Sequence, residues 1–288
     1  MDTVTTQQTR AHLHAMWAAV APAWADYAED VDRRGAAMTE RLLADAQVKS
    51  GDRVLELASG PGGAGLRAAA VVGDHGDVVI SDVVPEMVAI AASRASALRL
   101  RNVTTATLDL EAIDQPDHTF DAAICREGLM FAVEPALAIR EIHRVLRPHG
   151  RLALSVWGSR DANPWLAIVI NAVTAVTGVQ VPPPGMPGPF ALADHDQLAD
   201  LVRQGGFDQV RVDTLDVSLR APSFDAWWAR TKAVAGPVAT IIAKLDADTS
   251  TGLQSRLRDD IAHVNTASTG IELPGLALIA SGRAVPST

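Results

Sequence analysis

A carboxylate and three glycines stand close together in one predicted strand-turn-helix unit. Segment 54–66 reads VLELASGPGGAGL, in which Gly60, Gly62 and Gly65 have the G-x-G-x-x-G spacing of a dinucleotide-binding loop. Glu56 precedes the first glycine by four residues and lies inside the strand. Glycines let a ligand approach the backbone closely, because they carry no Cβ. The segment therefore predicts a ligand site, and Glu56 raises the question of which ligand needs a carboxylate beside such a turn.

Further charged side chains stand at the ends of later predicted strands. Asp82 and Asp109 end the second and third strands, and Arg126 and Glu127 directly follow the fourth. A carboxylate at position 82 can accept from both hydroxyls of a ribose, but an acid about 20 residues past the glycines also serves NAD. Structural roles are open too: Glu56 and Asp109 could cap turns or pair with cations, and Arg126 could pair with Glu127.

These residues need a scaffold, and the sequence predicts an α/β one. Apolar segments alternate with helical patterns between residues 53 and 157. This alternation is typical of βαβ units and a parallel sheet. The predicted strands are 53–57, 78–81, 103–108, 120–125 and 151–157, and the helices between them are 63–72, 85–98 and 135–146.

Helical segments flank and interrupt this core. Helices are expected over 8–47, 163–177 and 223–266, and these segments are expected to meet over one edge of the sheet as a lid. The segment 181–189, VPPPGMPGP, can be neither helix nor central strand, because proline removes a donor and fixes φ. The expected parts are a helical cap (1–48), a ligand-binding core (49–160), a lid segment with the proline-rich loop (161–195), a core continuation (196–220), a helical lid insertion (221–268) and a final core strand (269–288).

Composition excludes several classes of protein. The 288 residues carry a net charge of −9 without clustered cations, which argues against a general nucleic-acid surface. The single Cys125 excludes an intrachain disulfide framework and a multi-cysteine zinc site, and it favours a reducing cytoplasm. Residues 15–25 resemble a short signal-peptide core, but an amphipathic helix is the preferred interpretation. His12 and His14 are two apart on a helix and make a poor metal pair, so no metal site is predicted.

Five motifs occur in order along the core and share a resemblance to one family. The chain resembles class I S-adenosylmethionine-dependent methyltransferases, and within them the small-molecule group that includes ubiquinone and menaquinone C-methyltransferases. The resemblance is close over 50–160 and looser over 196–215. The motifs are VLELASGPGG (54–63), ISDVVPEMVAIAASRA (80–95), LDLEAI (108–113), FDAAICREGLMF (120–131) and EIHRVLRPHGRLALSVWG (141–158).

The resemblance implies a Rossmann-like fold. It implies a seven-stranded, mostly parallel sheet of order 3-2-1-4-5-7-6, with strand 7 antiparallel. Phe207–Leu219 would be strand 6 and Ile271–Val285 strand 7, with a helical insertion between them.

The resemblance also implies S-adenosylmethionine as cofactor and S-adenosylhomocysteine as product. Glu56 would accept from the methionine ammonium, and Gly60 and Gly62 would admit the methionyl end. Asp82 would bind the ribose and Asp109 the adenine amino group. The remaining expected cofactor contacts are Ala58, Val83, Met87, Leu110 and Arg126, of which Val83 and Met87 would pack on the adenine or serve as ordinary core.

Two positions depart from the family pattern. Ala58 and His149 stand where the family usually has glycine. Alanine at 58 is tolerable if its φ is negative, and His149 is expected on the surface in a helix-to-strand turn.

Methyl transfer from a sulfonium is an in-line displacement, to which alignment and water exclusion contribute much of the acceleration. A general base matters mainly for an acceptor hydroxyl of high pKa. Glu127 is the expected residue for orienting or deprotonating the acceptor. Trp17, Trp24 and Trp157 would wall the substrate pocket, although each could equally be plain core.

The predicted function is methyl transfer to a small, partly apolar acceptor enclosed by the lid, with no nucleic-acid partner and no stable membrane insertion. A second hypothesis is an S-adenosylmethionine-binding protein repurposed for sensing or for other chemistry. A third, an NAD(P)-dependent oxidoreductase, rests only on the glycine spacing and Asp82. The sequence leaves the acceptor and its methylated atom open, and a homodimer is compatible with it.

Overall fold

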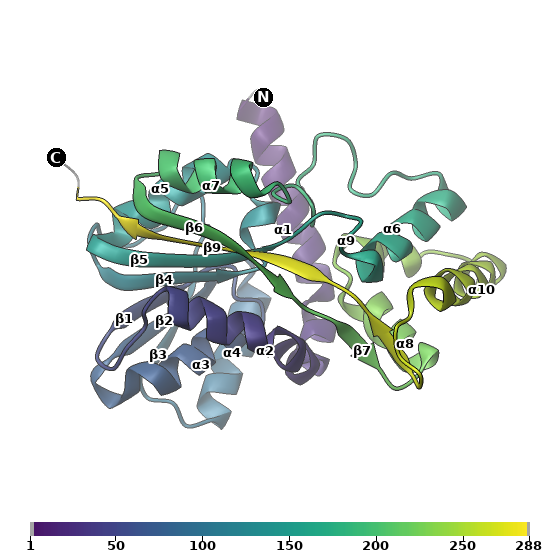
Figure 1. The fold of residues 1–288 in the computed structure, drawn as a ribbon, viewed down its shortest axis with the longest axis horizontal. Helices are drawn as coiled ribbons and strands as arrows, with labels where there is room; N and C mark the ends of the chain where they lie inside the picture. The colour runs from purple at the N-terminus through teal and green to yellow at the C-terminus, as the bar shows by residue number, and fades with distance from the viewer. Residues whose placement is uncertain (1–2, 287–288) are drawn as a thin grey trace.

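A computed structural model describes residues 3–286, which build a seven-stranded sheet flanked by helices (Figure 1). The sheet order is β3-β2-β1-β4-β5-β9-β6, and β9 runs antiparallel to both of its neighbours. The predicted order and the antiparallel strand are thus confirmed. The strands are β1 (Arg53–Glu56), β2 (Asp77–Asp82), β3 (Val103–Thr107), β4 (Phe120–Arg126), β5 (Leu146–Trp157), β6 (Phe207–Asp216) and β9 (Leu276–Ala284).

The parallel half of the sheet positions the site. The strands β1, β2 and β4 are almost fully apolar at their centres, where Val54, Leu55, Ile80 and Ile124 are buried. The order in which strands are added to the sheet reverses between β1 and β4. Ligands of open α/β sheets bind at such a point, beyond the carboxyl ends of the strands. The connecting helices are α3 (Gly63–Val72), α4 (Pro85–Ala97), α5 (Pro135–Val145) and α7 (His195–Gln204), with short 3₁₀ turns η1 (Gly73–His75) and η2 (Leu129–Phe131).

The two last strands of the sheet differ from the prediction. Phe207–Leu219 and Ile271–Val285 were each expected to be one strand, but both are interrupted, and their outer parts, β7 (Leu219–Ala221) and β8 (Ile271–Leu273), form a separate two-stranded ribbon. Pro274 and Gly275 explain the break, because proline supplies no ladder donor and Gly275 lies against the backbone of Val217.

The ribbon supports a second hydrophobic core. We call this part the accessory cluster: β7, β8, α6 (Pro164–Thr177), α8 (Phe224–Val234), α9 (Pro237–Ile242) and α10 (Ala247–Val264). Trp227, Leu253, Leu257 and Val169 are completely buried at its centre. The proline-rich segment 181–189 forms neither helix nor strand and packs its Val181 on the same core, as its composition predicts.

The N-terminal helices connect the two cores. Helix α1 (Thr3–Asp26) contacts α4 of the sheet domain as well as α8 and α9 of the accessory cluster, and it runs past the carboxyl edge of the sheet in Figure 1. Helix α2 (Ala28–Asp45) packs on β4, β5 and β9. No helix within residues 3–286 is long and apolar enough to cross a membrane.

Candidate active site

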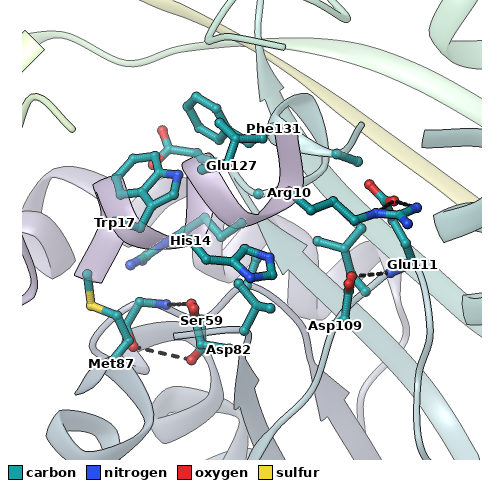
Figure 2. Close-up of a pocket in the computed structure, with 18 of the residues that line it drawn as sticks. Arg10, His14, Trp17, Ser59, Asp82, Met87, Asp109, Glu111, Glu127 and Phe131 are labelled. Carbon is teal, nitrogen blue, oxygen red and sulfur yellow. Dashed lines mark hydrogen bonds and ion pairs between the residues drawn. The ribbon is translucent and has the colours of Figure 1, made fainter. Parts of the chain in front are cut away.

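A cavity of about 950 Å³ lies between α1 and the carboxyl ends of β1, β2, β3 and β4. The cavity, which we call the cofactor cavity, is drawn in Figure 2. It brings together eight predicted cofactor residues and three predicted catalytic or pocket residues: Ala58, Gly60, Asp82, Val83, Met87, Asp109, Leu110, Arg126, Glu127, Trp17 and Trp24.

Of the three spaced glycines, Gly60 alone lines the cofactor cavity. Its φ is 52°, a conformation that glycine adopts without strain, and its N–H donates to Asp82 at 2.8 Å. A Cβ on Gly62 would lie 2.8 Å from the Cβ of Ala91, and one on Gly65 would lie 2.3 Å from Oε2 of Glu56. These two glycines therefore allow close packing inside the protein, which differs from the ligand contact expected of Gly62.

The N-terminus of α3 already holds an anionic side chain. A Cβ on Gly63 would lie 1.7 Å from Oδ1 of Asp32, so the α2 carboxylate covers the backbone where a dinucleotide pyrophosphate would bind. Asp32 also forms ion pairs with Arg94 and Arg126. The G-x-G-x-x-G spacing therefore does not create a phosphate site here.

Asp82 lies at the centre of the cavity floor. Its two carboxylate oxygens accept from the N–H groups of Gly60 at 2.8 Å and Val84 at 2.9 Å. Burial raises the pKa of Asp82 to about 6, although these backbone donors oppose the shift. Val83 and Met87 lie beside it, where Met87 packs against Ala21 of α1 and keeps one side on the cavity.

Glu56 does not line the cavity in this structure, unlike the expectation from the motif. Its carboxylate is buried under the glycine loop, and its Oε2 has no hydrogen-bond partner. Burial raises the pKa of Glu56 to about 8, against the opposing charge of Arg126. Arg126 itself donates to Thr39 at 2.7 Å, so its guanidinium holds α2 against the end of β4.

Asp109 and Glu111 line the other end of the cavity, after β3. Asp109 accepts from the N–H of Glu111 at 2.8 Å and so closes a turn, while its side chain remains on the cavity. Glu111 is buried, forms an ion pair with Arg10 of α1, and accepts from the N–H of Glu134 at 3.1 Å. Arg10 pairs with Glu134 as well, at 2.7 Å.

Helix α1 covers the cavity with the predicted Trp17 and with two residues, Arg10 and His14, that sequence analysis did not select. Arg10, His14 and Trp17 recur at intervals of four and three residues, a spacing that places them on one helix face above Asp82 and Asp109 (Figure 2). That spacing was a readable signal. The role of this helix face could not be predicted, because nothing in the sequence says which element a helix will cover.

Two cavity residues have left-handed backbone conformations. The φ of Ala58 is 49°, which corrects the expectation of a negative value and explains why glycine is usual at this position. The φ of Glu127 is 62°. Non-glycine residues in this region are uncommon and cluster at functional sites. His149, the other departure from the family pattern, has a φ of 68° and is exposed, as expected.

A second cavity, of about 1050 Å³, lies between the sheet edge and the accessory cluster. We call it the acceptor cavity. Its walls are mainly apolar, and they include Trp157, as predicted, together with Trp165 and prolines of the segment 181–189. Arg34, Arg230, Asp30 and Glu127 are its charged residues. The two cavities share five lining residues: Trp17, Trp24, Val31, Glu127 and Phe131.

Aromatic rings and one carboxylate form the shared wall. The ring of Trp17 lies edge-on to those of Phe131 and Trp24, with centroids 5.0 and 5.9 Å apart. Oε1 of Glu127 is buried without a hydrogen-bond partner, and Oε2 lies 3.4 Å from Arg34. The free oxygen of Glu127 can accept from a ligand that spans the two cavities.

No group of three or more histidine, cysteine or acidic side chains in the described part of the chain could hold a metal ion. Cys125 is buried as predicted, and burial raises the pKa of its thiol to about 12.

Residues 48–176 match the family model described as "Methyltransferase domain". This match covers less than half of the chain, which over that part is similar to a methyltransferase domain.

Among curated proteins, the chain is similar to ubiquinone/menaquinone biosynthesis C-methyltransferases. It is 36% identical to the one from Teredinibacter turnerae over 106 residues, which cover 36% of this chain and 43% of that protein. It is 27% identical to the one from Photorhabdus laumondii over 186 residues, covering 59% of this chain and 72% of that protein. The match therefore spans less than half of the first relative.

Among solved structures, the fold is similar to that of the YcgJ protein from Bacillus subtilis, with a TM-score of 0.58 and 18% identity over 86% of this chain and 98% of that one. It is also similar to the [4+2]-cyclase SpnF, with a TM-score of 0.52 and 24% identity over 88% of this chain and 82% of that one. At these identities the likeness concerns the fold.

Proposed function

We propose that this protein transfers the methyl group of S-adenosylmethionine to a small, partly apolar acceptor. One observation carries the proposal: the cofactor cavity and the acceptor cavity share a wall made of Trp17, Trp24, Val31, Glu127 and Phe131. A cofactor in the first cavity can thus present its methyl group to a molecule in the second.

The cofactor cavity has groups that suit each part of S-adenosylmethionine. Asp82 would accept from the ribose hydroxyls and Asp109 from the adenine amino group, while Val83, Met87 and Leu110 would contact the adenine. The methionyl end would lie over Ala58 and Gly60. Glu56, with an unpartnered oxygen directly below the loop, would attract the ammonium through the loop or through water.

The chain's own residues would promote transfer by alignment and by exclusion of water. The faces of Trp17 and Phe131 carry partial negative charge and favour a cationic sulfonium beside them. S-adenosylmethionine supplies the electrophilic methyl group, and the S–C electron pair stays on sulfur as the new bond forms. Glu127 would accept a hydrogen bond from the acceptor's hydroxyl or amine and take its proton.

Access to both cavities would depend on the helices that cover them. We propose that α1 and the accessory cluster act as the lid, because they supply the walls opposite the sheet. The family's fold also occurs in a [4+2]-cyclase, so the fold by itself does not fix the reaction. We place the protein in the cytoplasm on its single, buried thiol.

The test is a transfer assay with methyl-labelled S-adenosylmethionine and a panel of apolar alcohols, phenols, amines and acids. We expect labelled product and S-adenosylhomocysteine in equal amounts, and a loss of both with Glu127→Gln. Glu40→Gln is the control, since Glu40 pairs with Arg67 on the exposed surface. Cofactor binding without transfer to any member would favour the sensing or alternative-chemistry hypothesis.

A further inference from the structure

The acceptor cavity contains two arginines in otherwise apolar surroundings. Arg34 comes from α2 and Arg230 from α8, and both line the cavity. The surrounding wall is built from tryptophan, leucine, isoleucine, valine and proline side chains. Guanidinium groups are costly to bury without an anionic partner, so their presence here requires an explanation.

Arg34 is fixed in place before any ligand binds. Its guanidinium lies over the rings of Trp157 and Trp165, 5.5 and 5.2 Å from their centroids. The two indoles restrict its rotation and present it to the cavity. Its Nε is nevertheless buried without a hydrogen-bond partner, and its only ion pair in the described residues is the 3.4 Å contact with Glu127.

The charge of Arg230 has even fewer compensating partners than that of Arg34. It donates to the carbonyl oxygen of Arg220 at 3.2 Å, and no carboxylate of the described residues lies within ion-pair distance. Burial lowers its pKa and the nearby charge of Arg34 lowers it further, whereas the charge of Asp30 opposes this shift. Asp30 also lines the cavity, but it pairs with Arg33 at 2.6 Å. Two arginines and two acids thus line the cavity, but Arg230 has no ion pair of its own among the described residues.

We propose that the methyl acceptor is an apolar carboxylic acid that also carries the hydroxyl or amine to be methylated, and that its carboxylate binds between Arg34 and Arg230. This inference rests on the proposed function, because it names the substrate class of the same site. A carboxylate would satisfy the unpartnered Nε of Arg34 and fits the planar donor fork of an arginine. A singly charged carboxylate suits the cavity better than a phosphate dianion, because Asp30 and Glu127 already line the same cavity. The apolar body of the acid would contact Trp157, Trp165 and Val181.

The test compares acids with their uncharged isosteres. The full chain is titrated by calorimetry, with and without saturating S-adenosylhomocysteine, with 2-naphthoate against 2-naphthamide and with decanoate against decanamide. We expect at least one acid to bind about tenfold more tightly than its amide, since a hydrogen bond to a charged group contributes about 1.5–3 kcal/mol. Equal binding of acid and amide in both pairs, or no binding by any of them, would overturn the proposal.

Variants assign the preference to the two arginines. Arg230→Met and Arg34→Gln should each reduce the acid-to-amide ratio to about threefold or less, with S-adenosylhomocysteine affinity unchanged. Arg34→Lys keeps the positive charge and the aliphatic part of the side chain but loses the planar guanidinium. It therefore tests the role of the guanidinium if Arg34→Gln disturbs the packing of the tryptophans. Arg256→Gln is the control, because Arg256 is an exposed α10 residue outside both cavities, and it should keep the full ratio. A ratio that survives both Arg34→Gln and Arg230→Met would overturn the assignment.

The two proposals fail in different ways. If S-adenosylhomocysteine does not bind but the acids are still preferred, the proposed function is wrong and the carboxylate site remains. If S-adenosylhomocysteine binds and the acids show no preference, the function remains and the substrate class is wrong.

Discussion

The two cavities share a wall but are built from different kinds of structure. The cofactor cavity is lined largely by residues at strand ends, such as Gly60, Asp82 and Asp109, and its polar groups are mostly acceptors. The acceptor cavity is lined by helices and a proline-rich loop, with tryptophans and the arginines Arg34 and Arg230. Backbone hydrogen bonds hold the residues of the cofactor cavity in position, whereas side-chain packing mainly holds those of the acceptor cavity. Under the proposed function, the first half would recognise the cofactor and the second half would recognise the acceptor.

The largest effect is expected from a substitution in the cofactor cavity alone. Asp82→Asn should weaken S-adenosylhomocysteine binding by about 100-fold or more, because an amide accepts poorly from two ribose hydroxyls and cannot keep both backbone hydrogen bonds. Equilibrium dialysis with labelled ligand measures it. Asp77→Asn, at the exposed start of the same strand, is the control. An affinity within threefold of wild type would show that Asp82 is structural only.

The next effect concerns the shared wall. Glu127→Gln should slow methyl transfer at least tenfold while leaving S-adenosylhomocysteine affinity within about threefold, since the base acts on the acceptor rather than on the cofactor. Single-turnover rates with an acceptor found in the transfer panel report the effect. A loss of cofactor affinity as large as the loss of rate would assign Glu127 to the cofactor half instead.

The pH dependence of cofactor binding should report Asp82. Its pKa is raised to about 6 by burial, and the ionised form is the better acceptor for hydroxyl groups. Affinity should therefore fall about tenfold between pH 7 and pH 5. The same titration on Asp82→Asn should be nearly flat. A wild-type profile that does not change over this range would contradict the assignment.

A smaller effect is expected where α1 closes the cofactor cavity. Arg10→Gln removes ion pairs with Glu111 and Glu134, so S-adenosylhomocysteine should dissociate about threefold to tenfold faster, with little change in association. Stopped-flow tryptophan fluorescence can follow this, because Trp17 and Trp24 line the cavity. Arg101→Gln, at an exposed position before β3, should have no effect. Equal rates in both variants would mean that α1 does not retain the ligand.

The smallest effect tests backbone strain in the cofactor half. Ala58→Gly should raise the free energy of unfolding by about 0.5 kcal/mol, because relief of a left-handed alanine slightly exceeds the entropy cost of glycine. Ala123→Gly, at a buried position of β4, should instead lower it by about 1–2 kcal/mol. Urea unfolding of both variants gives the sign of each change in the free energy of unfolding. A destabilised Ala58→Gly variant would contradict the claim that the backbone at Ala58 is strained.

The same contrast explains how much the sequence could predict. The family resemblance implied the sheet order, which is confirmed. Apolar alternation placed Asp82 and Asp109 at strand ends, and the ends of parallel strands meet at one edge of the sheet. The motifs of that family placed Glu56 and Gly62 at the ligand, whereas here Glu56 is buried below the loop and Gly62 packs on Ala91. A sequence motif shows that a position requires a small or an acidic residue, but it does not show which neighbouring group imposes that requirement.

The acceptor half could not be predicted in the same way. Arg34 and Arg230 are nearly 200 residues apart on two helices, and no motif connects them. Their proximity depends on how α2 and α8 pack, which is decided by the cores as a whole. The break after Asp216 was also missed, because its cause lies in Pro274 and Gly275 of the partner strand.

Calorimetric titration of the wild-type chain with S-adenosylhomocysteine, NAD and NADP tests the central claim most directly. The account predicts micromolar binding of S-adenosylhomocysteine and no binding of either dinucleotide, because Asp32 covers the N-terminus of α3 where a pyrophosphate would lie. Binding of NAD or NADP without S-adenosylhomocysteine would contradict it and would make the G-x-G-x-x-G spacing a true dinucleotide loop.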